Sequence, residues 1–383
     1  MSQPDFYNRL LKAIFCQGEP DRVPMVEAGI ATPIKEKFLG RKITSLRDEI
    51  EFWESAGYDF IPLEAGLRTI IDAAIHHEGT GRFEGADPDA AKVARAKEFA
   101  INQLSKFRLT TINADGSVRS WAPEGKGFIN SLEDLEAFPW PAPTDMDYSK
   151  FEAIKELLPP GMGVICYAGA IFSSLMLMMG LEECFIGMSQ GSELFTKLLK
   201  KVGEFQVKVV EILLETGSVG GIWINDDMGF QTGPLVSPKL YQKYIFPYYR
   251  EIKQLVRSKG VPLLLHSDGN ITRILPDLAE IGFNAIHPIQ PECMDILQAR
   301  QILGDKVCVI GNLSLGYPLG TGTPEEVARE AELLIRKLAP GGGYCFSSGN
   351  SIPDYIPYEN WLAMRDTGLR VGVYPIQASL IAW

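Results

Sequence analysis

Short apolar runs recur along the chain after Tyr58, and each ends in polar or glycine-rich residues before a segment with helical spacing. The runs have the length of buried strands, and the segments between them repeat apolar residues at three- and four-residue steps. One more run of this kind stands near the start of the chain. The eight runs are DRVPMVEAG, YDFIPLEAG, GVICYAG, GGIWINDDMG, VPLLLHSDG, FNAIHPIQP, KVCVIGNLS and GGYCFSSGN.

Two of the intervening segments carry clear helix-boundary signals. SPKLYQKYIFPYYREIKQLVRSKG has Ser237 as its expected N-cap and Gly260 as its expected end. TPEEVAREAELLIRKLAPGG has Thr323 as its expected cap, with Pro324 at the first helical position and glutamates in the first turn. Both segments are therefore predicted to be helices that connect successive strands.

Eight strands that alternate with helices predict an α/β fold of the (β/α)8 TIM-barrel type. A doubly wound sheet is the alternative, but no GxGxxG follows the first strand. Residues 79–147 depart from the alternation, with a β-hairpin expected to turn at Ala114-Asp115-Gly116. We therefore predict a single barrel domain over residues 1–383, with residues 79–147 as an insertion at or near the mouth of the barrel.

Composition narrows the class of protein. The chain has 383 residues, 46% of them hydrophobic, and a net charge of -11, and it shows no stripe of Lys and Arg. Nucleic acid is therefore not an expected partner. Six scattered cysteines without a CxxC pair indicate reduced thiols and a cytoplasmic location. Residues 159–181 are uncharged but interrupted by proline and glycine, so we expect a buried strand and helix there and no membrane span.

Polar side chains stand at the end of almost every predicted strand. In a (β/α)8 barrel these ends meet at one mouth, where active sites of this fold are built. Any one of these residues could simply form a turn or cap a helix, but together they could protonate a leaving group, bind a divalent metal or hold a substrate. They are Glu27, Glu64, Asn225, Asp226, Asp227, His266, Ser267, Asp268, His287, Gln290, Asn312, Ser347, Ser348 and Asn350.

The chain resembles the uroporphyrinogen decarboxylase superfamily, and within it the corrinoid-dependent methyltransferases, including aromatic O-demethylases. The resemblance rests on INDDMGFQTGPLVSPKLYQKYIFPYY, LLLHSDGN, IGFNAIHPIQ, PGGGYCFSSGNSIPDYIPYENWLAM and GVYP, and on WAPEGKGFI and FPWPAP earlier in the chain. It covers most of the chain, most strongly after Gly161. It implies one (β/α)8 barrel with a deep mouth.

Two departures from the family pattern bear on function. Porphyrinogen decarboxylases carry an arginine-rich RQAGR-type signature near the N-terminus, where this chain reads DRVPMVEAGIATP with Arg22 alone. Thiol-activating methyltransferases of the superfamily bind zinc through His-x-Cys and a later Cys. Here these places read His266-Ser267-Asp268 and Gly349-Asn350. The resemblance therefore implies an oxygen-rich or metal-free site, suited to taking a methyl group from an ether or a similar donor.

The implied reaction moves a methyl group from a small donor to the cobalt of a corrinoid (cobalamin). The chain has no DxHxxG motif of the kind that ligates cobalamin, so the corrinoid would be carried by a separate protein. His266 with Asp227 or Asp268 would hold a metal, with zinc as one choice, or supply a proton. The candidate site residues are His266, Asp226, Asp227 and Glu64 as catalytic groups, Asn225, Asn350, Trp121 and Asn312 as substrate-binding groups, and His266 and Asp268 as metal ligands.

Two other functions stay open at this point. One is a metal-free lyase that decarboxylates a small carboxylic acid held by Arg68 or Arg22, and the other is a barrel that only binds a metabolite. The many titratable residues at strand ends disfavour the second. Trp121, Trp140, Trp223 and Phe230 favour an aromatic methyl donor. The expected partners are that donor and a corrinoid protein, with no membrane, and the chain is a candidate homodimer.

Overall fold

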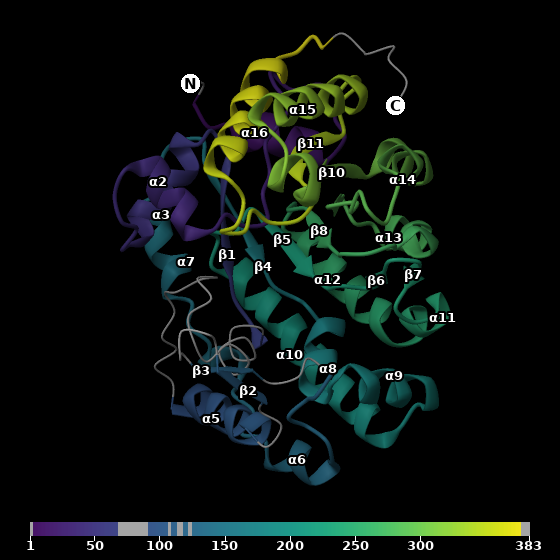
Figure 1. Cartoon of the computed structure of the whole chain (residues 1–383). Coiled ribbons are helices and arrows are strands. Elements are labelled where there is room, and N and C mark those ends of the chain that lie inside the picture. The colour runs from purple at the N-terminus through teal and green to yellow at the C-terminus, as the bar shows by residue number, and fades with distance from the viewer. Residues whose placement is uncertain (1–2, 68–90, 106–108, 113–117, 122–124, 377–383) are drawn as a thin grey trace.

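A curled, parallel sheet forms the centre of the molecule, with helices around it (Figure 1). The computed structural model describes residues 3–67, 91–105, 109–112, 118–121 and 125–376 of the chain. Seven strands pair in the order β1-β4-β5-β8-β9-β10-β11. Their bounds are β1 Phe60–Glu64, β4 Gly163–Tyr167, β5 Gly221–Asn225, β8 Leu263–His266, β9 Ala285–His287, β10 Cys308–Leu313 and β11 Tyr344–Ser348.

The first apolar run supplies the eighth position of the barrel. Met25 forms a parallel bridge with Phe346 of β11, and the two backbone hydrogen bonds around it join Val26 to Phe346 and Phe346 to Pro24. Glu27 adds a side-chain link, because its carboxylate accepts the Ser348 backbone N–H at 2.9 Å and the Ser348 hydroxyl at 2.7 Å. Seven of the eight predicted runs therefore contain strands and the first contributes a parallel bridge, and the predicted (β/α)8 class is confirmed.

Alternation along the strands separates an inner from an outer core, as the pleat requires. Apolar side chains, among them Ile165, Leu264 and Ile310, fill the inside of the barrel. The N-terminal segment, a π-helical turn at Phe6–Leu11 followed by α1 Lys12–Ile14, packs into the same cluster. The Phe6 ring occupies the space beside Gly163 and Gly220, where a Cβ would come within 2.3 and 2.6 Å of it. Phe6 thus closes the end of the barrel at which β4 and β5 begin.

The outer layer follows the predicted alternation. Thr323 caps α15 as expected, with a hydrogen bond from Glu326 N and a reciprocal one from Thr323 N to the Glu326 carboxylate. Ser237 precedes α11 but makes no side-chain cap, which corrects the expectation for that residue. The main outer helices are α2 Thr32–Leu39, α3 Leu46–Ser55, α8 Phe172–Met179, α9 Leu181–Gln190, α10 Glu193–Glu215, α11 Pro238–Leu240, α12 Phe246–Ser258, α13 Leu275–Ile281, α14 Ile296–Leu303, α15 Pro324–Leu338 and α16 Tyr358–Val371.

Between β1 and β4 the described part of the chain contains elements outside the barrel pattern. Strands β2 Leu109–Ile112 and β3 Val118–Trp121 pair antiparallel, with Leu109 opposite Trp121, while their predicted turn lies outside the described residues. Three helices, α5 Ala91–Ser105, α6 Leu132–Ala137 and α7 Ser149–Ala153, complete this segment. Figure 1 shows α5, the hairpin and α6 grouped together at the lower end of the view. Ile129 N donates to Met178 O, which fastens the segment to α8.

The cysteines and the uncharged stretch 159–181 can both be placed in the fold. Cys166, Cys308 and Cys345 are fully buried within strands. The uncharged stretch 159–181 contains strand β4 and helix α8. None of the described helices combines the length and the apolar character that crossing a membrane requires.

Candidate functional site

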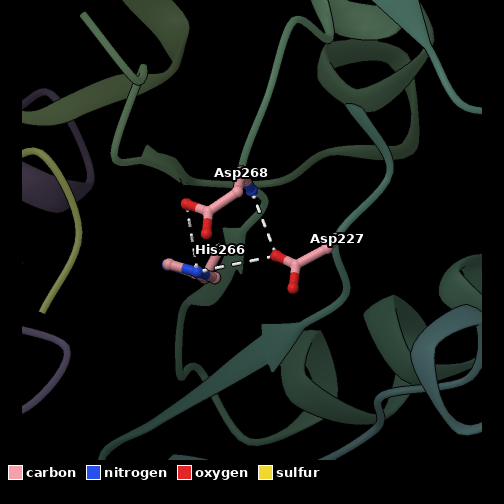
Figure 2. A group of neighbouring side chains, drawn as sticks. All are labelled: Asp227, His266 and Asp268. Atoms are coloured by element: carbon pink, nitrogen blue, oxygen red, sulfur yellow. Dashed lines mark hydrogen bonds and ion pairs between the residues drawn. The ribbon is translucent and has the colours of Figure 1, made fainter. Parts of the chain in front are cut away.

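Three polar side chains meet at the carboxyl ends of β5 and β8. The Nε2 atom of His266 lies 3.7 Å from Oδ1 of Asp227 and 3.6 Å from Oδ1 of Asp268. Figure 2 shows both carboxylates directed toward the imidazole. His266 ends β8 on the inner face of the barrel, whereas Asp227 and Asp268 stand on the loops that follow the two strands. The imidazole is buried, and the two carboxylates are partly exposed.

Hydrogen bonds from neighbouring loops orient the two carboxylates. The backbone N–H of Asp268 donates to Oδ1 of Asp227 at 3.1 Å. Asn350, on the loop after β11, donates from Nδ2 to Oδ2 of Asp268 at 2.6 Å. Oδ2 of Asp268 is thus engaged with Asn350 while Oδ1 faces His266. The structure therefore brings together His266, Asp227, Asp268 and Asn350, four of the predicted site residues.

This group has the spacing of a site for a divalent cation. One donor atom from each of Asp227, His266 and Asp268 lies within 4.8 Å of the others. Two ligands bound at about 2.1 Å around a tetrahedral cation lie roughly 3.4 Å apart. The measured separations of 3.6 and 3.7 Å need only small shifts to reach that geometry. The residues present thus fit a zinc-like ion held by imidazole and carboxylate.

A second histidine lies directly behind the first. His287 ends β9 opposite His266 in the strand register, and the two Nδ1 atoms are 2.8 Å apart. On its other side, Nε2 of His287 lies 3.2 Å from the Ser347 hydroxyl. Burial, and then the neighbouring His266, hold the pKa of His287 well below its ordinary value, so this imidazole is neutral. The edge of His287 packs against the Trp223 ring, with ring centroids 5.1 Å apart.

Glu64 and Asn225 lie beside this group, at the carboxyl ends of β1 and β5. They line a cleft with Tyr167, Gln206 and four small residues, Ala65, Ala168, Gly169 and Ala170. Asn225 pairs in register with His266, so the cleft and the cation site are neighbours across β5 and β8. The hydroxyl of Tyr167 donates to Ala28 O at 2.8 Å, and its ring stacks on Trp223.

The structure does not bring Asp226 into this group, which corrects the expectation for that residue. Asn225 faces the interior, so the next side chain along the strand points outward. Asp226 is fully buried there and accepts the Tyr249 hydroxyl at 2.6 Å. It also accepts the backbone N–H groups of Ile171, Phe172 and Ser173 at the start of α8. These contacts join the end of β5 to the start of α8 and to α12, so they give Asp226 a structural role. They do not support a catalytic role.

One predicted substrate-binding residue, Asn312, is also placed differently. The Asn312 side chain is buried and donates to Ile289 O at 2.7 Å, so its amide serves the backbone between β9 and α14. Trp121 lies in β3, and its side chain falls outside the described residues. Sequence reasoning overlooked Gln206 because it projects from α10, far from any strand end. His287 was among the polar residues predicted at strand ends, because it is the last residue of β9.

Comparison with known proteins places this geometry in context. The family model described as "Uroporphyrinogen decarboxylase (URO-D)" matches residues 120–369. The uroporphyrinogen decarboxylase of Syntrophotalea carbinolica is 26% identical over 173 residues, which are 45% of this chain and 48% of that protein. The methylcobamide:CoM methyltransferase MtbA of Methanosarcina acetivorans is 28% identical over 166 residues, 42% of this chain and 47% of that protein. The chain thus matches about half the length of these relatives.

A solved structure matches over almost the whole chain. A methyltransferase from Methanosarcina mazei superposes with a TM-score of 0.62 and covers 96% of this chain and 99% of its own, at 16% sequence identity. At this identity the likeness shows a common fold.

Proposed function

The chain belongs to the uroporphyrinogen decarboxylase family, and from this premise we propose that it transfers a methyl group from a small donor to the cobalt of a corrinoid carried by a separate protein. We propose an aromatic methyl ether as the donor. In the overall reaction the methyl–oxygen bond breaks and its electron pair stays on oxygen, which gains a proton. The methyl group receives a new electron pair from reduced cobalt, so the two substrates balance without a further oxidant.

The group formed by His266, Asp227 and Asp268 carries this proposal. An ether oxygen leaves only when its developing negative charge is stabilised by a Lewis acid or a proton donor. A divalent cation held by these three side chains would supply the Lewis acid. Two hard carboxylates donate less charge to such an ion than two thiolates do, so it keeps more of its acidity. The open edge of the site, where Asp227 and Asp268 are partly exposed, leaves room for the donor.

The surroundings of the site support an aromatic donor. The lining of the cleft next to the cation site includes Tyr167 and four small residues, apolar surface of the kind that contacts an aromatic ring. Phe230, in the short hairpin of β6 Gly229–Phe230 and β7 Gly233–Pro234, is 58% exposed. Its carbonyl accepts the backbone N–H of Asn270, which holds this hairpin next to the loop of Asp268.

The names of several relatives support the corrinoid partner. Two relatives, from Methanosarcina acetivorans and Methanosarcina mazei, are named methylcobamide:CoM methyltransferase. This name lists a methylated cobamide as a substrate of those enzymes. The same family contains decarboxylases, which makes a lyase acting on a carboxylic acid the second candidate. Arg22 does not favour this candidate, because it lies before the first strand and donates to Gly57 O, near Asp59. Arg68 lies outside the described residues.

The test is to incubate the chain with a corrinoid protein reduced to cobalt(I) and a panel of methoxylated benzenes, and to follow the cobalt absorption spectrum. We expect methylation that depends on added zinc and falls at least tenfold in Asp227→Asn and Asp268→Asn. Asp277→Asn is the matched control, since this carboxylate on the outer helix α13 accepts a hydrogen bond from Gln242 and is not part of the site. Carbon dioxide release from a carboxylic acid, with no change in the cobalt spectrum, would favour the lyase instead.

A further inference from the structure

The two carboxylate oxygens of Asp268 have different surroundings. Oδ1 lies 3.6 Å from Nε2 of His266 and is the oxygen that faces the cation site. Oδ2 accepts a hydrogen bond from Nδ2 of Asn350 at 2.6 Å. Asp268 follows β8 and Asn350 follows β11, so this bond joins two loops whose strands are separated in the sheet by β9 and β10.

A backbone contact fixes which end of the Asn350 amide faces Asp268. The backbone N–H of Ser351 donates to Oδ1 of Asn350 at 2.7 Å. An N–H group pairs only with an acceptor, so this atom is the amide oxygen and the atom beside Asp268 is the amide nitrogen. Because this nitrogen only donates, Oδ2 of Asp268 accepts and carries no proton.

The loop that carries Asn350 is anchored on the barrel at both sides. Before it, the Ser348 hydroxyl lies 3.1 Å from the carbonyl oxygen of Asn350, and the backbone N–H and hydroxyl of Ser348 both bond to Glu27. After it, Ile352 forms a parallel bridge with Ile30. Asn350 therefore acts on Asp268 from a fixed position, as the outer partner of a metal ligand does.

The bond to Asn350 limits how Asp268 can bind an ion. A carboxylate that binds through both oxygens must direct both of them at the ion, and this turn would draw Oδ2 away from Asn350. Hydrogen bonds to a charged carboxylate are among the stronger ones in proteins, so binding through Oδ1 alone is favoured. Asp227, His266 and Asp268 then contribute one ligand atom each.

The number of protein ligands decides which ions the site suits. Three protein ligands leave one position open on a four-coordinate zinc ion, as in catalytic zinc sites. Manganese prefers six ligands and a larger number of oxygen atoms, so it gains more when a carboxylate supplies both of its oxygens. The contact between Asn350 and Asp268 therefore favours zinc over manganese.

We infer that Asn350 is a positioning residue that restricts Asp268 to one ligand oxygen and so keeps the ion of this site four-coordinate, with one position open. Asn350 acts through Asp268 and not by contact with the substrate. The inference rests on the proposed function for the use of the open position by the methyl donor. The coordination itself is a property of the protein and the ion alone.

Metal titrations on the full chain test this role without a methyl donor or a corrinoid protein. Calorimetry would compare the zinc and manganese affinities of the unchanged protein with those of Asn350→Leu, which keeps the volume of the side chain but cannot donate. We expect zinc affinity to fall by about 10- to 100-fold, the usual cost of losing the outer partner of a ligand. Manganese affinity should fall less, because the released carboxylate can use both oxygens, so the zinc-to-manganese ratio should fall by about tenfold.

Free cobalt(II) reports the coordination of the ion directly. Tetrahedral cobalt(II) absorbs visible light strongly, whereas six-coordinate cobalt(II) absorbs it weakly. We expect strong bands with the unchanged protein and weaker bands with Asn350→Leu. A merely structural role of Asn350 would change the affinities without changing the shape and strength of these bands.

Two further variants control for folding and for the loss of a side chain. Ser351→Ala keeps the backbone N–H that orients Asn350, so its metal ratio and cobalt spectrum should match those of the unchanged protein. Asn350→Ala removes the donor together with most of the side chain and should reproduce the effects of Asn350→Leu. Thermal unfolding of each variant verifies that it is folded.

The outcomes separate this inference from the proposed function. An unchanged zinc-to-manganese ratio in folded Asn350→Leu, weak cobalt bands with the unchanged protein, or no binding of either ion would overturn the inference. Loss of all metal binding in folded Asn350→Leu would also overturn it and would make Asn350 a ligand. Methyl transfer to cobalt with an unchanged ratio would leave the proposed function standing. The expected ratio and spectra without methyl transfer would leave the role of Asn350 and refute the proposed function.

Discussion

The Nδ1 atoms of His266 and His287 are 2.8 Å apart, so one of these two histidines must donate a proton to the other. Nε2 of His266 faces two carboxylates and is the ring atom directed toward the cation site. When a cation binds Nε2 of the neutral ring, the ring proton lies on Nδ1, and His266 is the donor. His287 therefore accepts at Nδ1 and donates from Nε2 to Ser347. This chain of contacts fixes the imidazole of His266 with Nε2 toward the site.

The first prediction concerns His287 as a positioning residue. His287→Phe keeps a ring in the buried space but removes the acceptor, so zinc affinity should fall by about 10- to 100-fold. His287→Asn keeps an acceptor near the place of Nδ1 and should recover part of the affinity. Zinc titration by calorimetry measures both variants, with thermal unfolding as the check on folding. Equal affinities in His287→Phe and the unchanged protein would mean that His287 only fills space.

The second prediction concerns His266 itself. His266→Ala removes the only imidazole that faces both carboxylates in the described part of the chain. Turnover with a methoxylated donor should fall by about 100-fold or more, the usual scale for a residue that binds the cation or transfers a proton. The initial rate of cobalt methylation measures the effect. A rate within a few-fold of the unchanged protein would remove His266 from the reaction.

The third prediction separates Asp226 from its neighbour Asp227. Asp226→Asn places an amide nitrogen among four hydrogen-bond donors, from Tyr249 and from the start of α8. We expect the free energy of unfolding to fall by about 3 kcal/mol, with zinc affinity unchanged. Tyr249→Phe removes one of the four donors and should cost about 1 kcal/mol. Denaturant unfolding measures both, and a stable Asp226→Asn protein that no longer binds zinc would reverse the assignment.

The sequence predicted the barrel and its mouth because both follow from the regular alternation of apolar runs with helical segments. Eight apolar runs gave the strands, and parallel strands bring the residues that end them, such as His266 and Glu64, to one edge. The direction of single side chains was harder to predict. Asn225, Asp226 and Asp227 are consecutive polar residues, and only the pleat decides that the middle one faces outward.

Two features depend on relations between distant segments and leave no local pattern. The contact of His266 with His287 needs the register of β8 against β9, which the sequence does not encode in either strand alone. Gln206 reaches the cleft from the middle of a long helix, where its neighbours predict only a buried face. Neither feature can be found from motifs at strand ends.

The last prediction concerns Glu27, which joins the first strand segment to β11. Its carboxyl is fully buried, and burial raises its pKa to about 8, against the hydrogen bonds from Ser348. The neutral acid still accepts both hydrogen bonds from Ser348, and it places no charge in this buried space. The folded state therefore binds a proton that the unfolded state releases near the ordinary pKa of 4.5.

The sign of the pH dependence follows from this difference. Stability from Glu27 is fully present below about pH 4.5 and is lost as the pH rises toward 8, by at most about 1.4 kcal/mol per pH unit. Glu27→Gln mimics the neutral acid and cannot ionise, so its stability should change less between pH 5 and 8. Denaturant unfolding at several pH values compares the two proteins, with Glu280→Gln, a substitution on α13, as the control for lost charge. Parallel stability curves for Glu27→Gln and the unchanged protein would show that Glu27 is ionised in the fold.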